Sequence, residues 1–149
     1  MPNRQHNNLI LKLGIAIASK NLNTIEEIGK LIQETGADDF TDGGFWLYGY
    51  DSNECYLSDK FLESLKYTRD EIISNVSFFY KTANNDHLNK GFEMLNELIE
   101  KKSESCFINY LDYTRKDGSI FNVECSGTCL YKFDKPYIVL GTHLLGYEK

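Results

Sequence analysis

Apolar residues in the first third of the chain follow a helical spacing. Residues 9–18 are apolar on almost every side of a helix, with only Lys12 interrupting them. Such a helix is stable only if all of its sides are buried. Thr24 and Glu27 have the spacing of a capping box and predict the start of a second helix that runs to about Thr35. The apolar stripe of that second helix consists of Ile25, Ile28, Leu31 and Ile32.

The middle third changes from a period of two to a helical period. Residues 45–50 alternate as a strand does, and a turn separates them from a partner strand at 54–57. Ser58 is placed to cap a short helix that ends near Tyr67. A longer amphipathic helix is predicted over 86–102, with Leu88, Phe92, Leu95 and Ile99 on one face.

The last third predicts antiparallel strands. Residues 106–115 and 120–133 are strand-like and are joined by a turn that contains Asp117 and Gly118, a pair typical of hairpins. A further turn at 134–136 leads to a strand that ends at Leu145. We therefore predict an α+β fold: a five-stranded antiparallel sheet with short connector helices and one long helix, preceded by an N-terminal helical extension.

Composition and charge restrict the class of protein. The 149 residues fit one domain with a short appendage, and a net charge of -6 argues against nucleic acid and anionic membranes as partners. Residues 9–18 are too few to span a bilayer, so we expect a cytoplasmic protein. The chain holds ten Tyr, nine Phe and one Trp, so aromatic residues make up 13% of the sequence.

The four cysteines are expected to be reduced thiols rather than disulfides or ligands. Cys125 and Cys129 share a strand face, but two thiols about 13 Å apart along a strand cannot hold one metal ion. Cys55 and Cys106 complete the set. The sequence also contains no nucleophile beside a base, no metal-binding His-Glu helix and no phosphate-binding glycine loop. We therefore predict no catalytic residues, no metal and no enzymatic activity.

Four segments, in order and at the usual separations, resemble the PAS domain family of sensory modules and its PAS-3 pattern. They are residues 44–48 (GFWLY), 56–72 (YLSDKFLESLKYTRDEI), 113–119 (YTRKDGS) and 139–143 (VLGTH). The resemblance covers residues 43–147 and implies a domain organisation with a helical extension at 1–40 and a PAS domain at 41–149.

Three positions depart from the family pattern. Lys66 stands where relatives usually have glycine, which is harmless if its backbone stays in an ordinary helical region. Asn122 stands where many relatives have tryptophan. Leu145 replaces the aspartate that commonly links a PAS sheet to an outgoing effector helix. We therefore expect a stand-alone module whose signal leaves through a separate partner chain.

The resemblance also implies a cavity on the concave side of the sheet, where aromatic and apolar residues can hold a small molecule. The alternative is that the same residues form a self-filled core, which would make the protein a purely structural interaction module. The candidates for the cavity are Trp46, Tyr48, Tyr56, Phe61, Phe79, Met94, Phe107, Val123, Cys125 and Leu140.

Haem and flavin are the two cofactors that PAS relatives suggest. His87 falls near the start of the long helix, where haem-binding PAS domains carry their axial imidazole, although a histidine at a polar helix entry is also ordinary. His6 and His143 are weaker candidates. The sequence lacks the reactive-cysteine motif of the light-sensing subclass, so a flavin could bind here only without a covalent bond to the protein.

The leading helices suggest a partner. We expect a homodimer formed through residues 8–35. The other expected partner is a small-molecule ligand, which the sequence does not identify. The alternative is that these helices fold back and cover the protein's own sheet.

Overall fold

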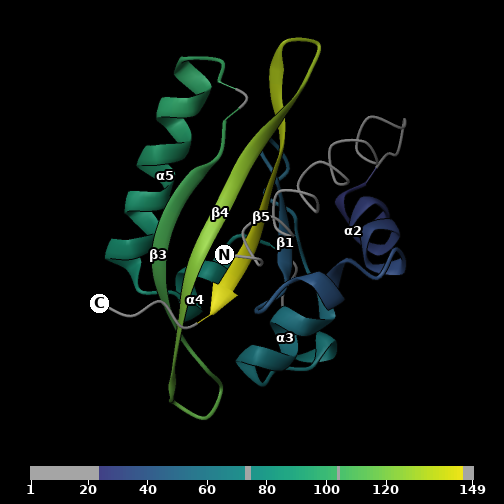
Figure 1. Cartoon of the computed structure of the whole chain (residues 1–149), viewed down its shortest axis with the longest axis vertical. Coiled ribbons are helices and arrows are strands. Elements are labelled where there is room, and N and C mark those ends of the chain that lie inside the picture. Colours follow the sequence, from purple (N-terminus) through teal and green to yellow (C-terminus); the bar gives the residue numbers. More distant parts are fainter. Residues whose placement is uncertain (1–23, 73–74, 104, 146–149) are drawn as a thin grey trace.

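The computed structural model describes residues 24–72, 75–103 and 105–145. It contains one five-stranded sheet in the order β2-β1-β5-β4-β3, in which all neighbouring strands are antiparallel (Figure 1). The strands are β1 (Phe45–Gly49), β2 (Cys55–Leu57), β3 (Phe107–Thr114), β4 (Ile120–Lys132) and β5 (Lys135–Leu145). The predicted α+β fold with its five-stranded antiparallel sheet is confirmed.

The helices begin where the sequence offers a capping side chain. Thr24 accepts a hydrogen bond from the Glu27 amide, and Ser58 accepts one from the Phe61 amide. The long helix begins after Asn84, whose side chain also accepts a backbone hydrogen bond. The α-helices are α2 (Ile25–Glu34), α3 (Asp59–Leu65), α4 (Ser77–Thr82) and α5 (Asn85–Glu100), with 3-10 turns at Ala37–Phe40 and Arg69–Glu71.

The helices cover both faces of the sheet. Helix α2 buries Ile28 and Ile32 completely against one face, which we call the outer face, and packs there on Leu47 and Leu140. Helix α5 lies on the opposite, inner face along β3 (Figure 1). Successive residues of a strand point to opposite faces, so β1 contributes Leu47 to the outer core and Trp46 to the inner one.

Three local features differ from the sequence predictions. Helix α4 was not predicted, because its residues form a short aromatic run without a helical period. The last hairpin turns at Phe133 and Asp134, both with positive φ, so that β5 already begins at Lys135. Lys66 also has a positive φ of 65° and ends α3 in the left-handed conformation that glycine adopts without strain. The condition under which lysine would be harmless at this position, an ordinary helical backbone, is therefore not met.

The described part of the N-terminal extension packs on its own domain. Helix α2 contacts β1 and β2, as in the fold-back alternative. The apolar run at 9–18, and His6, lie outside the described residues.

Candidate functional site

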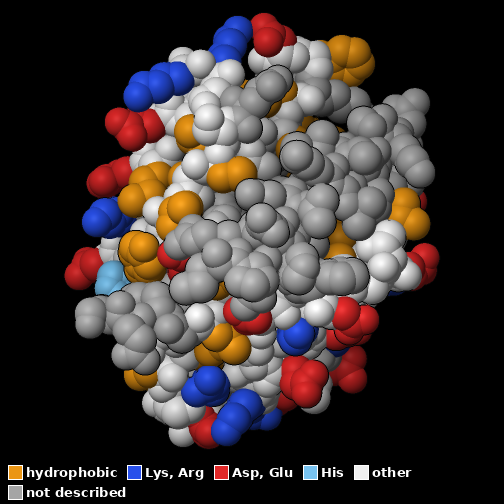
Figure 2. Space-filling view, in the orientation of Figure 1, with side chains coloured by type: hydrophobic (Ala, Val, Ile, Leu, Met, Phe, Trp, Pro, Cys, Tyr) orange, Lys and Arg blue, Asp and Glu red, His pale blue; other side chains and the backbone are white. Residues whose placement is uncertain are grey.

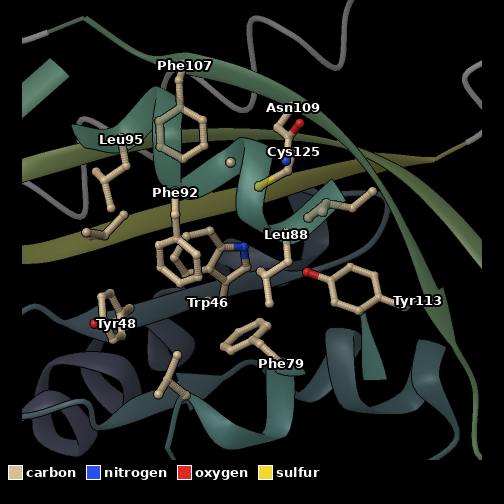
Figure 3. A pocket seen from close by; sticks show the side chains of 14 residues that line it. Trp46, Tyr48, Phe79, Leu88, Phe92, Leu95, Phe107, Asn109, Tyr113 and Cys125 are labelled. Carbon is tan, nitrogen blue, oxygen red and sulfur yellow. The ribbon is translucent and has the colours of Figure 1, made fainter. Parts of the chain in front are cut away.

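The inner face of the sheet and the helices above it form an apolar pocket of about 60 Å³ (Figure 3). Each of the strands β1, β3, β4 and β5 contributes to its wall, and α4 and α5 close it from the other side. The lining residues are Trp46, Tyr48, Val76, Phe79, Leu88, Gly91, Phe92, Leu95, Phe107, Asn109, Leu111, Tyr113, Cys125 and Val139.

Two glycines of the sheet leave room for the large rings of the pocket wall. A Cβ atom at Gly141 would lie 2.3 Å from the indole of Trp46, and one at Gly127 would lie 2.6 Å from the ring of Phe107. Both distances are far below van der Waals contact, so the rings lie directly on glycine backbone. The sequence thus places its single tryptophan directly against the backbone of β5.

Phe92 connects the pocket to the protein surface. Its ring lines the pocket and packs edge-on against Tyr48, with 6.4 Å between centroids. The same ring stacks on Tyr80, which is 47% exposed. A change in the position of Phe92 would therefore alter both the pocket and an exposed aromatic side chain.

Few polar groups line the pocket, and none of the lining side chains carries a charge. The Tyr48 hydroxyl donates to Asn53, and the Asn109 amide donates to the backbone carbonyl of His87. Burial raises the pKa of the Cys125 thiol to about 12. The neighbouring Trp46 N–H acts on this pKa in the opposite direction, but the N–H and the sulfur do not meet hydrogen-bond geometry. Cys125 is therefore a protonated, unreactive thiol at neutral pH.

The ten cavity candidates are distributed over both faces. Trp46, Tyr48, Phe79, Phe107 and Cys125 line the pocket. Phe61 and Val123 are completely buried in the adjoining inner core, and Met94 is half-buried on α5 outside the lining. Their role in ligand binding stays a prediction.

Tyr56 and Leu140 lie on the outer face, away from the pocket. Both pair directly with Leu47 across neighbouring strands, and paired residues point to the same side of a sheet. Because Leu47 faces α2, its two partners also pack there. Placing them at the inner cavity was an error of register.

Several lining residues were missed by the sequence interpretation. Phe92 and Leu95 were recognised as helix positions but not as part of the pocket. Asn109 and Tyr113 belong to the same alternating face of β3 as Phe107. Extending the alternation from Phe107 along β3 would have found them.

His87 does not fit the axial position of a haem in this pocket. It lies on the first turn of α5 but outside the pocket lining. Its Nδ1 accepts a hydrogen bond of 3.2 Å from the backbone amide of Asp112, and its carbonyl accepts from Asn109. His87 thus links α5 to β3.

The pocket does not fit a flavin or a haem by size or by polarity either. Pockets for drug-sized ligands measure about 300–1,000 Å³, compared with about 60 Å³ here. A flavin ring system also needs several hydrogen-bond partners for its carbonyl and N–H groups, and the lining is almost wholly apolar.

His143 is completely buried beside the inner core. Its Nδ1 lies 3.4 Å from the carbonyl of Gly43 and therefore carries the proton that it donates, while Nε2 lies 3.5 Å from the hydroxyl of Tyr113. The ring packs against Phe61 with a centroid separation of 4.6 Å. Burial lowers its pKa to about 4, so the imidazole is neutral.

Metal binding and membrane crossing find no support in the described ranges. Within residues 24–72, 75–103 and 105–145, no group of three or more His, Cys, Asp or Glu is placed to hold an ion. No helix of this part of the chain is long and apolar enough to cross a membrane.

Figure 2 shows acidic and basic side chains interspersed around the rim of the displayed face.

Sequence comparison identifies the family. The family model of the PAS fold matches residues 54–143, which is more than half of the chain, so this protein belongs to the PAS family. The domain therefore has the PAS fold. No curated protein sequence matches the chain.

Solved structures show the same fold. A sensory box histidine kinase/response regulator from Burkholderia thailandensis has a TM-score of 0.59 and 16% identity, with 76% of this chain and 83% of that chain covered. A LOV protein of Rhodobacter sphaeroides has a TM-score of 0.56 and 15% identity, with 78% of this chain and 66% of that chain covered. The present chain thus spans just under two thirds of the Rhodobacter protein.

Proposed function

We propose that this protein is a sensory or regulatory module that binds a small molecule in the inner pocket and has no catalytic output of its own. The observation that carries this proposal is the apolar pocket between α5 and the sheet. It is lined by uncharged side chains from six elements, so a bound molecule would contact most of the inner layer.

A signal requires that the ligand favour one of two packings of the protein. Phe92 supplies a physical route, because it contacts the pocket on one side and exposed Tyr80 on the other. A ligand that displaces Phe92 changes the surface between α4 and α5. A separate partner chain that binds this surface would receive the signal.

Filling the pocket is expected to abolish small-molecule binding. Cys125→Met adds two heavy atoms to a lining side chain and should occupy much of the 60 Å³. We expect small apolar probes such as xenon to shift the NMR signals of lining methyl groups in the unmodified protein but not in this variant.

The control variant is Cys106→Met, which makes the same change at an exposed cysteine outside the lining. It should bind the probe as the unmodified protein does. If no probe perturbs the lining signals of the unmodified protein, the core is self-filled, and the protein is a purely structural interaction module.

We also propose that the chain forms a homodimer through its leading residues. The apolar run at 9–18 supports this proposal, since such a helix needs cover all round. Helix α2 is already committed to its own sheet, so the partner contact would involve the segment before it.

Deleting residues 1–22 is therefore expected to convert a dimer into a monomer, as measured by light scattering. This deletion keeps the Thr24 cap and the packing of α2 on β1 and β2, so the domain retains its outer core. The control variant is Leu31→Asp, which changes a half-buried position of α2 and should leave the dimer intact if α2 takes no part in the interface. A dimer that persists after the deletion would exclude the leading segment as the interface.

A further inference from the structure

The indole N–H of Trp46 is a buried hydrogen-bond donor that has no partner among the described residues. The other polar groups of the lining differ in this respect: the Tyr48 hydroxyl, the Asn109 amide nitrogen and the Tyr113 hydroxyl each have a neighbour within 3.5 Å. Figure 3 shows Trp46 among Phe92, Phe79 and Leu88 in the wall of the pocket. The unpartnered donor therefore belongs to a side chain that forms part of the pocket wall.

A buried donor without an acceptor is rare, because it has lost its water without gaining a replacement. The cost is removed when a ligand or an ordered water supplies an acceptor at that position. The Cys125 sulfur beside the indole is a weak acceptor and does not meet hydrogen-bond geometry with it. A stronger acceptor in the pocket would satisfy the N–H.

The pocket also limits the charge and the size of what it can hold. An ion would be desolvated there without a counter-charge, since no Lys, Arg, His, Asp or Glu lines the wall. The volume of about 60 Å³ is well below the roughly 150 Å³ of an engineered cavity that holds benzene. A molecule held wholly within this space would therefore be uncharged and smaller than benzene.

We infer that the ligand of this pocket is a compact, uncharged molecule with an apolar body and one hydrogen-bond acceptor, such as a ketone oxygen, which accepts from the Trp46 N–H. The inference rests on the proposed small-molecule function and specifies its ligand class. It assigns Trp46 the part of the polar anchor and the surrounding aliphatic and aromatic side chains that of the apolar enclosure.

Acetone and isobutene form a matched pair of probes, because they differ only in an oxygen in place of a methylene group. Trp46 is the single tryptophan of the chain, so its indole N–H gives one assignable signal in a nitrogen-proton NMR spectrum. We expect acetone to move this proton signal downfield in a saturable way. Isobutene should perturb the lining methyl signals but produce no such downfield shift.

Trp46→Phe removes the donor and keeps an aromatic ring. One neutral hydrogen bond corresponds to about a three- to tenfold change in affinity, so the affinity ratio of acetone to isobutene should fall by that factor in this variant. In Cys125→Met, the saturable indole shift should disappear because the pocket is filled. The shift in the unmodified protein decides the question even if Trp46→Phe does not fold.

The outcomes separate the ligand class from the function itself. If both probes bind and acetone leaves the indole proton unmoved, the inferred ligand class is wrong while the small-molecule function stands. The same conclusion follows if the affinity ratio is unchanged in Trp46→Phe. If neither probe perturbs any lining signal, the proposed function fails.

Discussion

Replacing Phe61 with alanine is expected to lower the free energy of unfolding by about 3–5 kcal/mol. The side chain is completely buried, and its ring packs against those of Tyr113 and His143 with centroid separations of 5.3 and 4.6 Å. Truncation removes these contacts and leaves a void in the inner core. Because small domains have only about 5–15 kcal/mol of stability in total, a loss of this size is a large fraction.

The midpoint of urea unfolding measures this loss, and Phe133→Ala is the matched control. Phe133 is 89% exposed at the tip of the β4–β5 hairpin, so its truncation should change stability by less than about 0.5 kcal/mol. If Phe61→Ala does not fold, Phe61→Leu provides a milder truncation whose midpoint should still fall below that of the control. Equal midpoints for the substitutions at 61 and 133 would refute the described inner core.

The second large effect is a loss of stability in mild acid that depends on His143. Burial lowers the pKa of this imidazole from 6.5 to about 4 in the folded protein. Between these values the unfolded chain binds a proton that the folded protein does not, so stability falls as the pH falls. The free energy of unfolding is not reduced by this group above pH 6.5, and the reduction is complete by about pH 4. At about 1.4 kcal/mol per pH unit, the total reduction is roughly 3 kcal/mol.

Denaturant unfolding at several pH values tests this prediction through its slope. His143→Gln does not titrate in this range, so its stability should fall less steeply between pH 6.5 and 4 than that of the unmodified protein. The groups that face the imidazole are the Gly43 carbonyl, Phe61, Tyr113 and, on the neighbouring strand, Cys125, and none of them titrates in this window. Parallel slopes for His143→Gln and the unmodified protein would contradict the prediction.

The elements with a clear period were predictable from the sequence. The period of two at 45–50 and the capped starts at Thr24 and Ser58 led directly to β1, α2 and α3. Helix α4 was missed because Phe78, Phe79 and Tyr80 form an aromatic run with no polar face to indicate a helical period. Its helix forms because Phe78 and Phe79 are buried under the neighbouring elements, which is a tertiary effect.

The candidate site depended on information that one strand does not contain. Alternation within β1 placed Trp46 and Tyr48 on a common face, and both line the pocket. The side of the sheet to which Tyr56 and Leu140 point follows from their pairing with Leu47, and this register joins segments far apart in the sequence. The empty space itself depends on how all these side chains pack together, so its volume could not be predicted.

The position of β5 in the sheet has a consequence for how the protein folds during synthesis. This strand occupies the centre of the sheet, between β1 and β4, although it is the last of the described strands along the chain. A nascent chain that has not yet released residues 135–145 from the ribosome has no partner for β1 apart from the three-residue β2. Pairing of the first strand with the last also closes a long loop, which slows folding. We therefore expect the domain to acquire protease resistance on the ribosome only after the whole of β5 has left the exit tunnel.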